Sequence, residues 1–191
     1  MGEEAYRTSN PPLRWQRLMD HNKASVEKSI VQNQQLSAML IAYQDDSFAG
    51  FPLDYRSDSE RAKVFQTAQL FVRAENPLAI AVLSQVWFVP KLDGSTHLPI
   101  RDSDQRREGV AINLFYRAQG RKFTTWSVRE IMRDNDGKIS GLLPDITIAD
   151  GVINGEVCRL FPLRPCSRAD QKHAQIALPP IAIVRQGGLH F

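Results

Sequence analysis

The chain has 191 residues, of which 42% are hydrophobic and 24% charged, and its formal net charge is +3. This balance is close to the globular average and argues against a wholly disordered chain, while no apolar run approaches the roughly 20 residues of a membrane-spanning helix. Two cysteines cannot build a disulfide framework, and the start Met1-Gly-Glu-Glu-Ala lacks a secretory signal, so we expect a cytoplasmic protein without membrane insertion.

The N-terminal third is expected to be an arm followed by a long helix. Residues 1–12 show no periodicity and include Asn10-Pro11-Pro12, which disfavours a helix there. Residues 13–43 contain neither proline nor glycine and are rich in helix formers, which predicts a first helix that the polar stretch 21–25 is able to interrupt. Residues 45–52 have the composition of a loop.

A second helix has clear start and stop signals. Ser57 is followed three residues later by Glu60, the capping-box pattern in which each side chain can accept from the other residue's backbone N–H. Pro77 disfavours helical geometry in the residue before it, so the helix is expected to end at Asn76.

Residues 78–89 are apolar and β-branched and lie between two prolines, which predicts a central strand covered on both faces. Alternation places Ala79 and Ala81 on one face, where their small side chains leave space for a closely packed helix. Trp87 shares that face and is expected to be a packing residue.

A β-hairpin is expected next. Residues 108–118 alternate, which predicts a half-buried strand with an inner face formed by Val110, Ile112, Leu114 and Tyr116. A two-residue turn at Gln119-Gly120 would pair Leu114 with Thr125, whereas a longer loop or a bulge would set Leu114 near Trp126. We prefer the second register because it gathers Trp126 and Val128 on the inner face.

Turn signals at 134–138 precede a further extended piece, and a short strand is expected around 157–161. Residues 162–191 contain four prolines, so we expect an irregular extension there, in which residues 181–184 are a candidate edge strand. The expected fold is therefore α+β: two N-terminal helices, the second packed on an antiparallel β-meander of three or more strands, then a Pro-rich tail. The expected domains are an arm (1–12), one α+β domain (13–161) and an extended C-terminal tail (162–191).

Motifs for cofactor or metal chemistry are missing from the sequence. The two common glycine-rich patterns of phosphate-binding loops, Gly-x-x-x-x-Gly-Lys and Gly-x-Gly-x-x-Gly, are both missing. Cys158 and Cys166 are separated by seven residues that include two prolines, which is not a zinc-ligand spacing. The fragment 134–137 lacks a calcium loop's outer carboxylates, because Met132 and Leu143 occupy those positions. We expect no cofactor, no metal ligand and no catalytic residue.

One enzyme class remains as an alternative. A helix followed by antiparallel strands with acids resembles the core of the restriction-endonuclease-like nucleases, which implies metal-binding roles for Asp104, Glu108 and Glu130. The third strand lacks the Glu-x-Lys pattern of that family, since it reads Arg129-Glu130-Ile131-Met132.

A second resemblance concerns Ser84-x-x-Trp87, a polar loop with Arg106 or Arg107, Glu108 opening a strand, and Arg133 before an Asp-Gly turn. This layout is similar to a widespread set of small uncharacterised bacterial proteins, over roughly residues 60–145. The run Arg101-Asp-Ser-Asp-Gln-Arg106 replaces their usual acid-His-Pro-Asp-Arg loop. The resemblance implies a helix followed by a meander and implies no activity.

We therefore favour a non-enzymatic binding or assembly protein, an accessory subunit that engages a larger partner or a second copy. The expected contact regions are the terminal extensions and the loop 91–107. Nucleic-acid binding or a nuclease-like activity is the alternative. The candidate partner-binding residues are Arg101, Arg106, Arg107, Arg121, Lys122 and Arg129.

Overall fold

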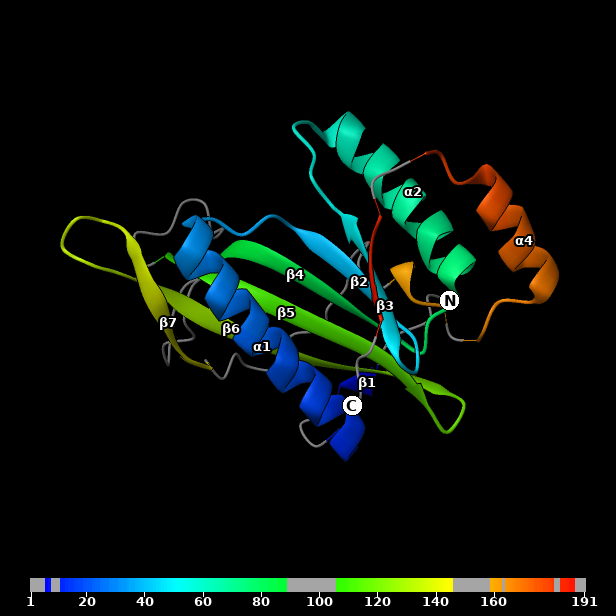
Figure 1. Ribbon diagram of the computed structural model, residues 1–191, viewed down its shortest axis with the longest axis horizontal. Helices are drawn as coiled ribbons and strands as arrows, with labels where there is room; N and C mark the ends of the chain where they lie inside the picture. Colours follow the sequence, from blue (N-terminus) through cyan, green and yellow to red (C-terminus); the bar gives the residue numbers. More distant parts are fainter. Residues whose placement is uncertain are drawn as a thin grey trace.

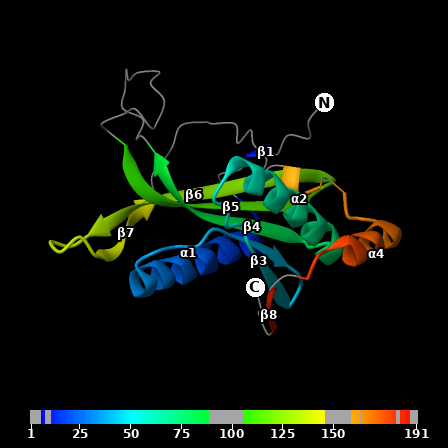
Figure 2. The same cartoon turned by 90° about the horizontal axis from the view of Figure 1, so that it is seen from above.

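The computed structural model describes residues 6–7, 11–88, 106–145, 159–162, 164–180 and 183–187. A twisted sheet runs through this part of the chain, with a helix on each face and a further helix packed against one of these two (Figures 1 and 2). The expected α+β class is confirmed. None of the described helices is long and apolar enough to cross a membrane.

The elements, in chain order, are β1 Tyr6–Arg7, α1 Leu13–Asn33, β2 Met39–Tyr43, β3 Ser47–Pro52, α2 Asp58–Glu75, β4 Ala79–Phe88, β5 Arg107–Ala118, β6 Arg121–Arg133, β7 Ile139–Asp145, α4 Arg168–Ala177 and β8 Val184–Gly187. The strands lie in the order β1-β6-β5-β4-β2-β3-β8, and β7 also pairs with β6. All described pairs are antiparallel except β1 with β6. The β4-β5-β6 meander is therefore extended by a β2–β3 hairpin on one side.

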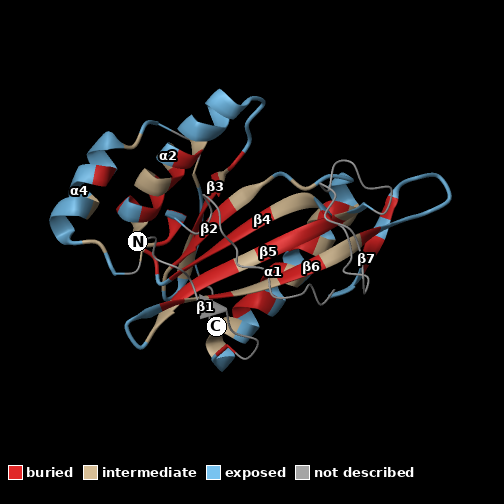
Figure 3. Cartoon of the chain, turned by 180° about the vertical axis from the view of Figure 1, so that it is seen from behind, coloured by how far each residue is buried: buried red, intermediate tan, exposed pale blue. Residues whose placement is uncertain are grey.

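Two apolar clusters occupy the two faces of the sheet. Buried residues of α1 pack with β4, β5, β6 and β7 on one face, and those of α2 pack with β2, β3 and β4 on the other. Strand β4 contributes Ala81 to the first cluster and Val82 to the second, so the prediction of a doubly covered strand is confirmed (Figure 3). Trp87 differs from expectation: it lies near the end of β4 with 56% of its surface exposed.

Helix α1 begins at Leu13 as predicted and continues through 21–25 without a break. Its polar residue Asn22 is buried and donates from its amide to the Leu18 carbonyl at 2.8 Å. The predicted continuation of this helix to residue 43 is wrong, because Gln34 adopts a left-handed conformation and Met39–Tyr43 form β2. The predicted loop at 45–52 is also wrong for most of its length, since Ser47–Pro52 form β3.

Helix α2 has the ends that the sequence predicted, at Ser57 and Asn76. The Ser57 hydroxyl accepts from the Glu60 backbone N–H at 3.2 Å. The Glu60 carboxylate accepts from the Arg56 backbone N–H at 2.7 Å, one residue before the expected donor.

The preferred register of the β5–β6 hairpin is wrong. Gln119 and Gly120 both have positive φ, which makes a two-residue turn, and Leu114 lies opposite Thr125. Strand β5 is also buried on both faces, since Phe115 is fully buried opposite the predicted inner face. Trp126 and Val128 therefore lie on the α2 side of the sheet, where they pack with Phe88.

The C-terminal extension contains regular structure where an irregular chain was expected. Ser167 caps α4 at its N-terminus, and this helix packs along α2. Strand β8 starts at Val184, the last residue of the predicted edge strand, and pairs with β3. Of the strand predicted around 157–161, residues 157–158 lie outside the described chain. The prediction is wrong for the rest, since residues 159–160 are helical and Phe161 is buried in the cluster beneath α2.

Candidate binding groove

The first helix leaves a groove of about 510 Å³ between itself and the β2–β3 side of the sheet. Helix α1 packs mainly against β5 and β7, so β2 and β3 are only partly covered on this face. One side of the groove is formed by α1, the floor by strands, and one end by the connection between α1 and β2. Figure 1 shows how α1 lies relative to these strands.

The floor of the groove is apolar. It is formed by Leu36, Met39, Ile41, Tyr43, Phe48 and Leu83. Leu36, Met39 and Phe48 are only partly buried, whereas Tyr43 and Leu83 lie deeper. A solvent-accessible apolar surface is therefore present inside a concave site.

The α1 wall of the groove is mostly polar, with Val26 as its apolar member. His21, Ser25, Ser29 and Asn33 recur every four residues, which places them in one row along the helix. Gln35 and Ser37 continue the polar lining beyond the helix. The lining drawn from the described residues contains no Asp, Glu, Lys or Arg.

A buried hydrogen-bond chain anchors the floor to the wall. The Tyr43 hydroxyl donates to Asn22 Oδ1 at 2.7 Å, and Asn22 Nδ2 donates to the Leu18 carbonyl at 2.8 Å. Burial raises the pKa of Tyr43 well above its usual range, although the contact with Asn22 opposes this. The Tyr43 hydroxyl therefore stays protonated and remains a donor at neutral pH.

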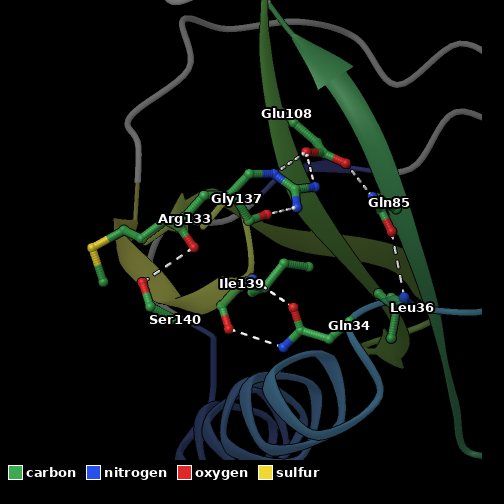
Figure 4. A network of polar contacts seen from close by, with 9 residues as sticks. Gln34, Leu36, Gln85, Glu108, Arg133, Gly137, Ile139 and Ser140 are labelled. Carbon is green, nitrogen blue, oxygen red and sulfur yellow. Dashed lines mark hydrogen bonds and ion pairs between the residues drawn. The ribbon is translucent and has the colours of Figure 1, made fainter. Parts of the chain in front are cut away.

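The end of the groove is held by side-chain amides that pair with backbone groups (Figure 4). Gln34 accepts from the Ile139 N–H at 2.6 Å and donates to the Ile139 carbonyl at 3.0 Å. Two residues later, the Leu36 N–H donates to Gln85 Oε1 at 3.3 Å. These contacts join the segment after α1 to both β4 and the start of β7.

The same network continues through the residues singled out by sequence resemblance. The amide of Gln85 donates to Glu108, whose other carboxylate oxygen accepts from Arg133 Nη2 at 2.6 Å and Nε at 3.2 Å (Figure 4). Arg133 also donates to the Gly137 carbonyl at 2.8 Å. Glu108 and Arg133, distant in sequence, thus meet in a network that positions Leu36 in the groove.

The predicted basic residues are spread over the molecule. Arg101 lies outside the described residues, and the Arg106 guanidinium lies 5.2 Å from the centroid of the exposed Trp87 ring. Arg107 pairs with Glu130 at 2.8 Å, and Arg129 pairs with Glu27 at 2.8 Å. The Glu27 contact places Arg129 on the α1 side of the sheet, and Arg107 projects from the opposite side.

The remaining two basic residues lie at the other end of the hairpin. Arg117, opposite Lys122, is ten residues from Arg107 along β5, about 33 Å at roughly 3.3 Å per residue. Arg121 is exposed, whereas Lys122 is only 1% exposed and donates to the Phe161 carbonyl at 3.2 Å. These cations do not converge on one surface.

The two described carboxylates considered for a nuclease, Glu108 and Glu130, do not converge. Glu108 projects toward the α1 side of the sheet and Glu130 toward the other side, while Asp104 lies outside the described residues. Among the residues that the structure describes, no three His, Cys, Asp or Glu side chains are grouped to hold a metal ion. Cys166 is a free thiol, and Cys158 is not among the described residues.

Sequence reasoning missed the groove. The four-residue spacing from His21 to Asn33 is a signal for a neutral polar edge on α1. That spacing alone does not reveal a site, because the floor is formed by β2 and β3, which were expected to be helix and loop.

No protein-family model, curated protein or solved structure matches this chain. A proposal for function therefore depends on the groove and on the groups that line it.

Proposed function

We propose that this chain is a non-enzymatic binding protein whose binding site is the groove between α1 and the β2–β3 hairpin. The supporting observation is an apolar floor that stays accessible beside a row of neutral hydrogen-bonding groups. Ligand sites in proteins are typically concave, mostly apolar and furnished with a few placed polar groups. This groove has that composition.

Apart from His21, the polar groups of the lining favour binding over reaction. Hydroxyl and amide groups such as those of Ser25, Ser29 and Asn33 orient a ligand but do not exchange protons readily near neutral pH. Tyr43, whose pKa is raised by burial, is held in its protonated form. Glu108 and Arg133, which carry charge near the groove's end, are engaged with each other and with backbone or amide groups.

Engagement of a larger partner remains part of the proposal, at two residues close to the ends of the segment between β4 and β5, Trp87 and Arg106. Trp87 is 56% exposed, and the Arg106 guanidinium lies over its ring. Tryptophan and arginine are the residue types most enriched at the energetic centres of protein interfaces. The described part of 162–191 supports this role less, because α4 and β8 already pack against α2 and β3.

The proposed site is tested by blocking the groove from the helix. In Ser29→Phe and Ser25→Phe, an aromatic ring replaces a groove-lining hydroxyl, while Lys28→Phe places the same ring on an exposed helix position that does not line the groove. Small apolar fragments are titrated into the full chain, and backbone amide NMR shifts are followed at Ile41 and Leu83. We expect saturable shifts in the wild type and in Lys28→Phe, and at least tenfold weaker binding in the two serine variants.

The melting temperatures of the wild type and the three variants are measured to confirm that each variant is folded. Two serine variants are used so that the test still stands if one of them fails to fold. Fragments that fail to shift groove amides in the wild type, or that bind equally to blocked and unblocked chains, would show that the groove is not a binding site.

A further inference from the structure

We infer that the groove takes an uncharged, amphipathic small molecule, with an apolar body on the strand floor and neutral hydrogen-bonding groups along α1. This inference rests on the proposed function and adds the chemical class of the ligand. Four features of the described residues support it: the residue types that line the groove, the direction of charged side chains on α1, the charges at the β2–β3 turn, and the volume of the groove.

The lining offers no described countercharge to an ionised ligand. Its described members are apolar or carry hydroxyl, amide or imidazole groups, without a carboxylate, ammonium or guanidinium. An ionised group that enters an apolar site loses hydration, which is unfavourable unless an opposite charge or several hydrogen bonds replace it. A neutral ligand avoids that loss.

Two charged side chains of α1 point away from the groove. Lys23 contacts Asp145 at 2.5 Å and Glu27 contacts Arg129 at 2.8 Å, so these two charges face β6 and β7. The row from His21 to Asn33 faces the groove instead. Its hydroxyl and amide groups both donate and accept, which matches alcohol, amide or carbonyl groups on a ligand.

The β2–β3 turn carries one ion pair and one further carboxylate, that of the exposed Asp46. Arg14 of α1 contacts Asp45 of this turn at 3.1 Å. The charges of Arg14 and Asp45 offset each other, and neither these two side chains nor Asp46 line the groove. The described lining therefore offers an ionic ligand no opposite charge.

The size of the groove fits a small molecule. Its volume of about 510 Å³ lies within the roughly 300–1,000 Å³ of small-molecule sites in proteins. A folded protein partner would need a much larger surface, about 800 Å² on each side of a stable interface.

Three probes with one apolar body test the ligand class: naphthylmethanol, naphthoate and naphthylmethylammonium. Each is titrated into the full-length chain at pH 8, where an ordinary histidine is neutral, and binding is followed at the amides of Ile41 and Ser29. We expect naphthylmethanol to bind at least tenfold more tightly than either ion. Ser25→Phe should weaken that binding at least tenfold, and Lys28→Phe should leave it within twofold of the wild type.

The outcomes separate this inference from the proposed function. If naphthoate or naphthylmethylammonium binds the groove as tightly as the alcohol, the ligand class is wrong while the groove remains a binding site. If none of the three probes shifts the groove amides, both proposals fail.

A second measurement uses the chain as purified from its native source. Organic extraction and mass spectrometry are expected to release a neutral amphipathic molecule from the wild type and not from Ser25→Phe. Release of an ionic compound or a peptide that is lost in the same variant would overturn the inference.

Discussion

Asp145, the last residue of β7, is held by partners from two other elements. Its carboxylate accepts from Lys23 Nζ of α1 at 2.5 Å and from the Ser127 hydroxyl of β6. Burial by itself raises the pKa of Asp145, but these two hydrogen bonds and the charges of Lys23 and Arg129 outweigh it and hold the pKa below its usual range. The ionised form is therefore favoured in the folded chain.

A lowered folded-state pKa makes the Asp145 contribution depend on pH. The stabilisation is fully present above the unfolded pKa of about 3.9 and is lost as pH falls through the lower folded value. Because the side chain is 43% exposed, solvent screening limits the contribution to about 0.5–1 kcal/mol. We expect Asp145→Asn to lower the free energy of unfolding at pH 7 by that amount, and to match the wild type at pH 2.

Urea unfolding followed by circular dichroism at both pH values checks this expectation. Asp46→Asn, at an exposed position in the β2–β3 turn, serves as the control and should change little at either pH. An Asp145→Asn deficit that is equally large at pH 2 would mean that ionisation of this carboxyl is not the cause.

At the scale of elements, one polar network adds hydrogen bonds between segments that also meet in the apolar cluster on the α1 side of the sheet. Through Gln85, Glu108 and Arg133 it links the connection after α1 with β4, β5 and the β6–β7 turn (Figure 4). The segment that closes the groove at Leu36 is thus held by side chains of the meander. Loss of one member should loosen that segment.

Glu108→Ala removes the acceptor of both Gln85 and Arg133. We expect a loss of about 1–2 kcal/mol in the free energy of unfolding, because the Glu108 side chain is only 19% exposed and its hydrogen bonds are charge-assisted. Faster hydrogen exchange is also expected at the Leu36 amide, whose acceptor Gln85 loses its own anchor.

Glu130→Ala is a matched control, since Glu130 also pairs with an arginine but projects from the other face of the sheet. Glu130→Ala should leave the hydrogen-exchange rate of the Leu36 amide unchanged. Equal exchange rates at Leu36 in the wild type and in Glu108→Ala would contradict a supporting role for this network.

At the scale of the whole molecule, β8 closes the β3 edge of the sheet. It pairs with β3, and Arg185 contacts the Glu75 carboxylate at 2.6 and 2.9 Å, which raises the pKa of Arg185. An uncovered strand edge offers unpaired backbone groups to another chain. The C-terminal segment therefore limits pairing at this edge.

A stop codon after residue 183 removes β8 and uncovers β3. We expect this truncated chain to melt at a lower temperature and to form larger species as its concentration rises, because two exposed β3 edges can pair. Size-exclusion chromatography with light scattering checks the mass. A stop after residue 187 keeps β8 and should behave as the full chain does, while a stop after 183 that stays unchanged in mass and melting temperature would refute the role of β8.

Local chemistry in the sequence determined several elements of this fold. Ser57 and Pro77 set the ends of α2 through a cap and a backbone restriction, both of which act over a few residues. The apolar run of β4 predicted coverage on both faces, and the start of α1 followed from the prolines before Leu13. Each of these signals needs no knowledge of distant parts of the chain.

Tertiary structure decided the rest, because burial depends on partners far away in sequence. Residues 39–43 include good helix formers, yet they are a strand because Leu40 and Ile41 are buried on opposite faces of the sheet. Coverage of both faces likewise set the β5–β6 register, since Trp126 could pack away from the predicted inner face. The groove, whose wall belongs to α1 and whose floor reaches Leu83, exists only where these segments meet.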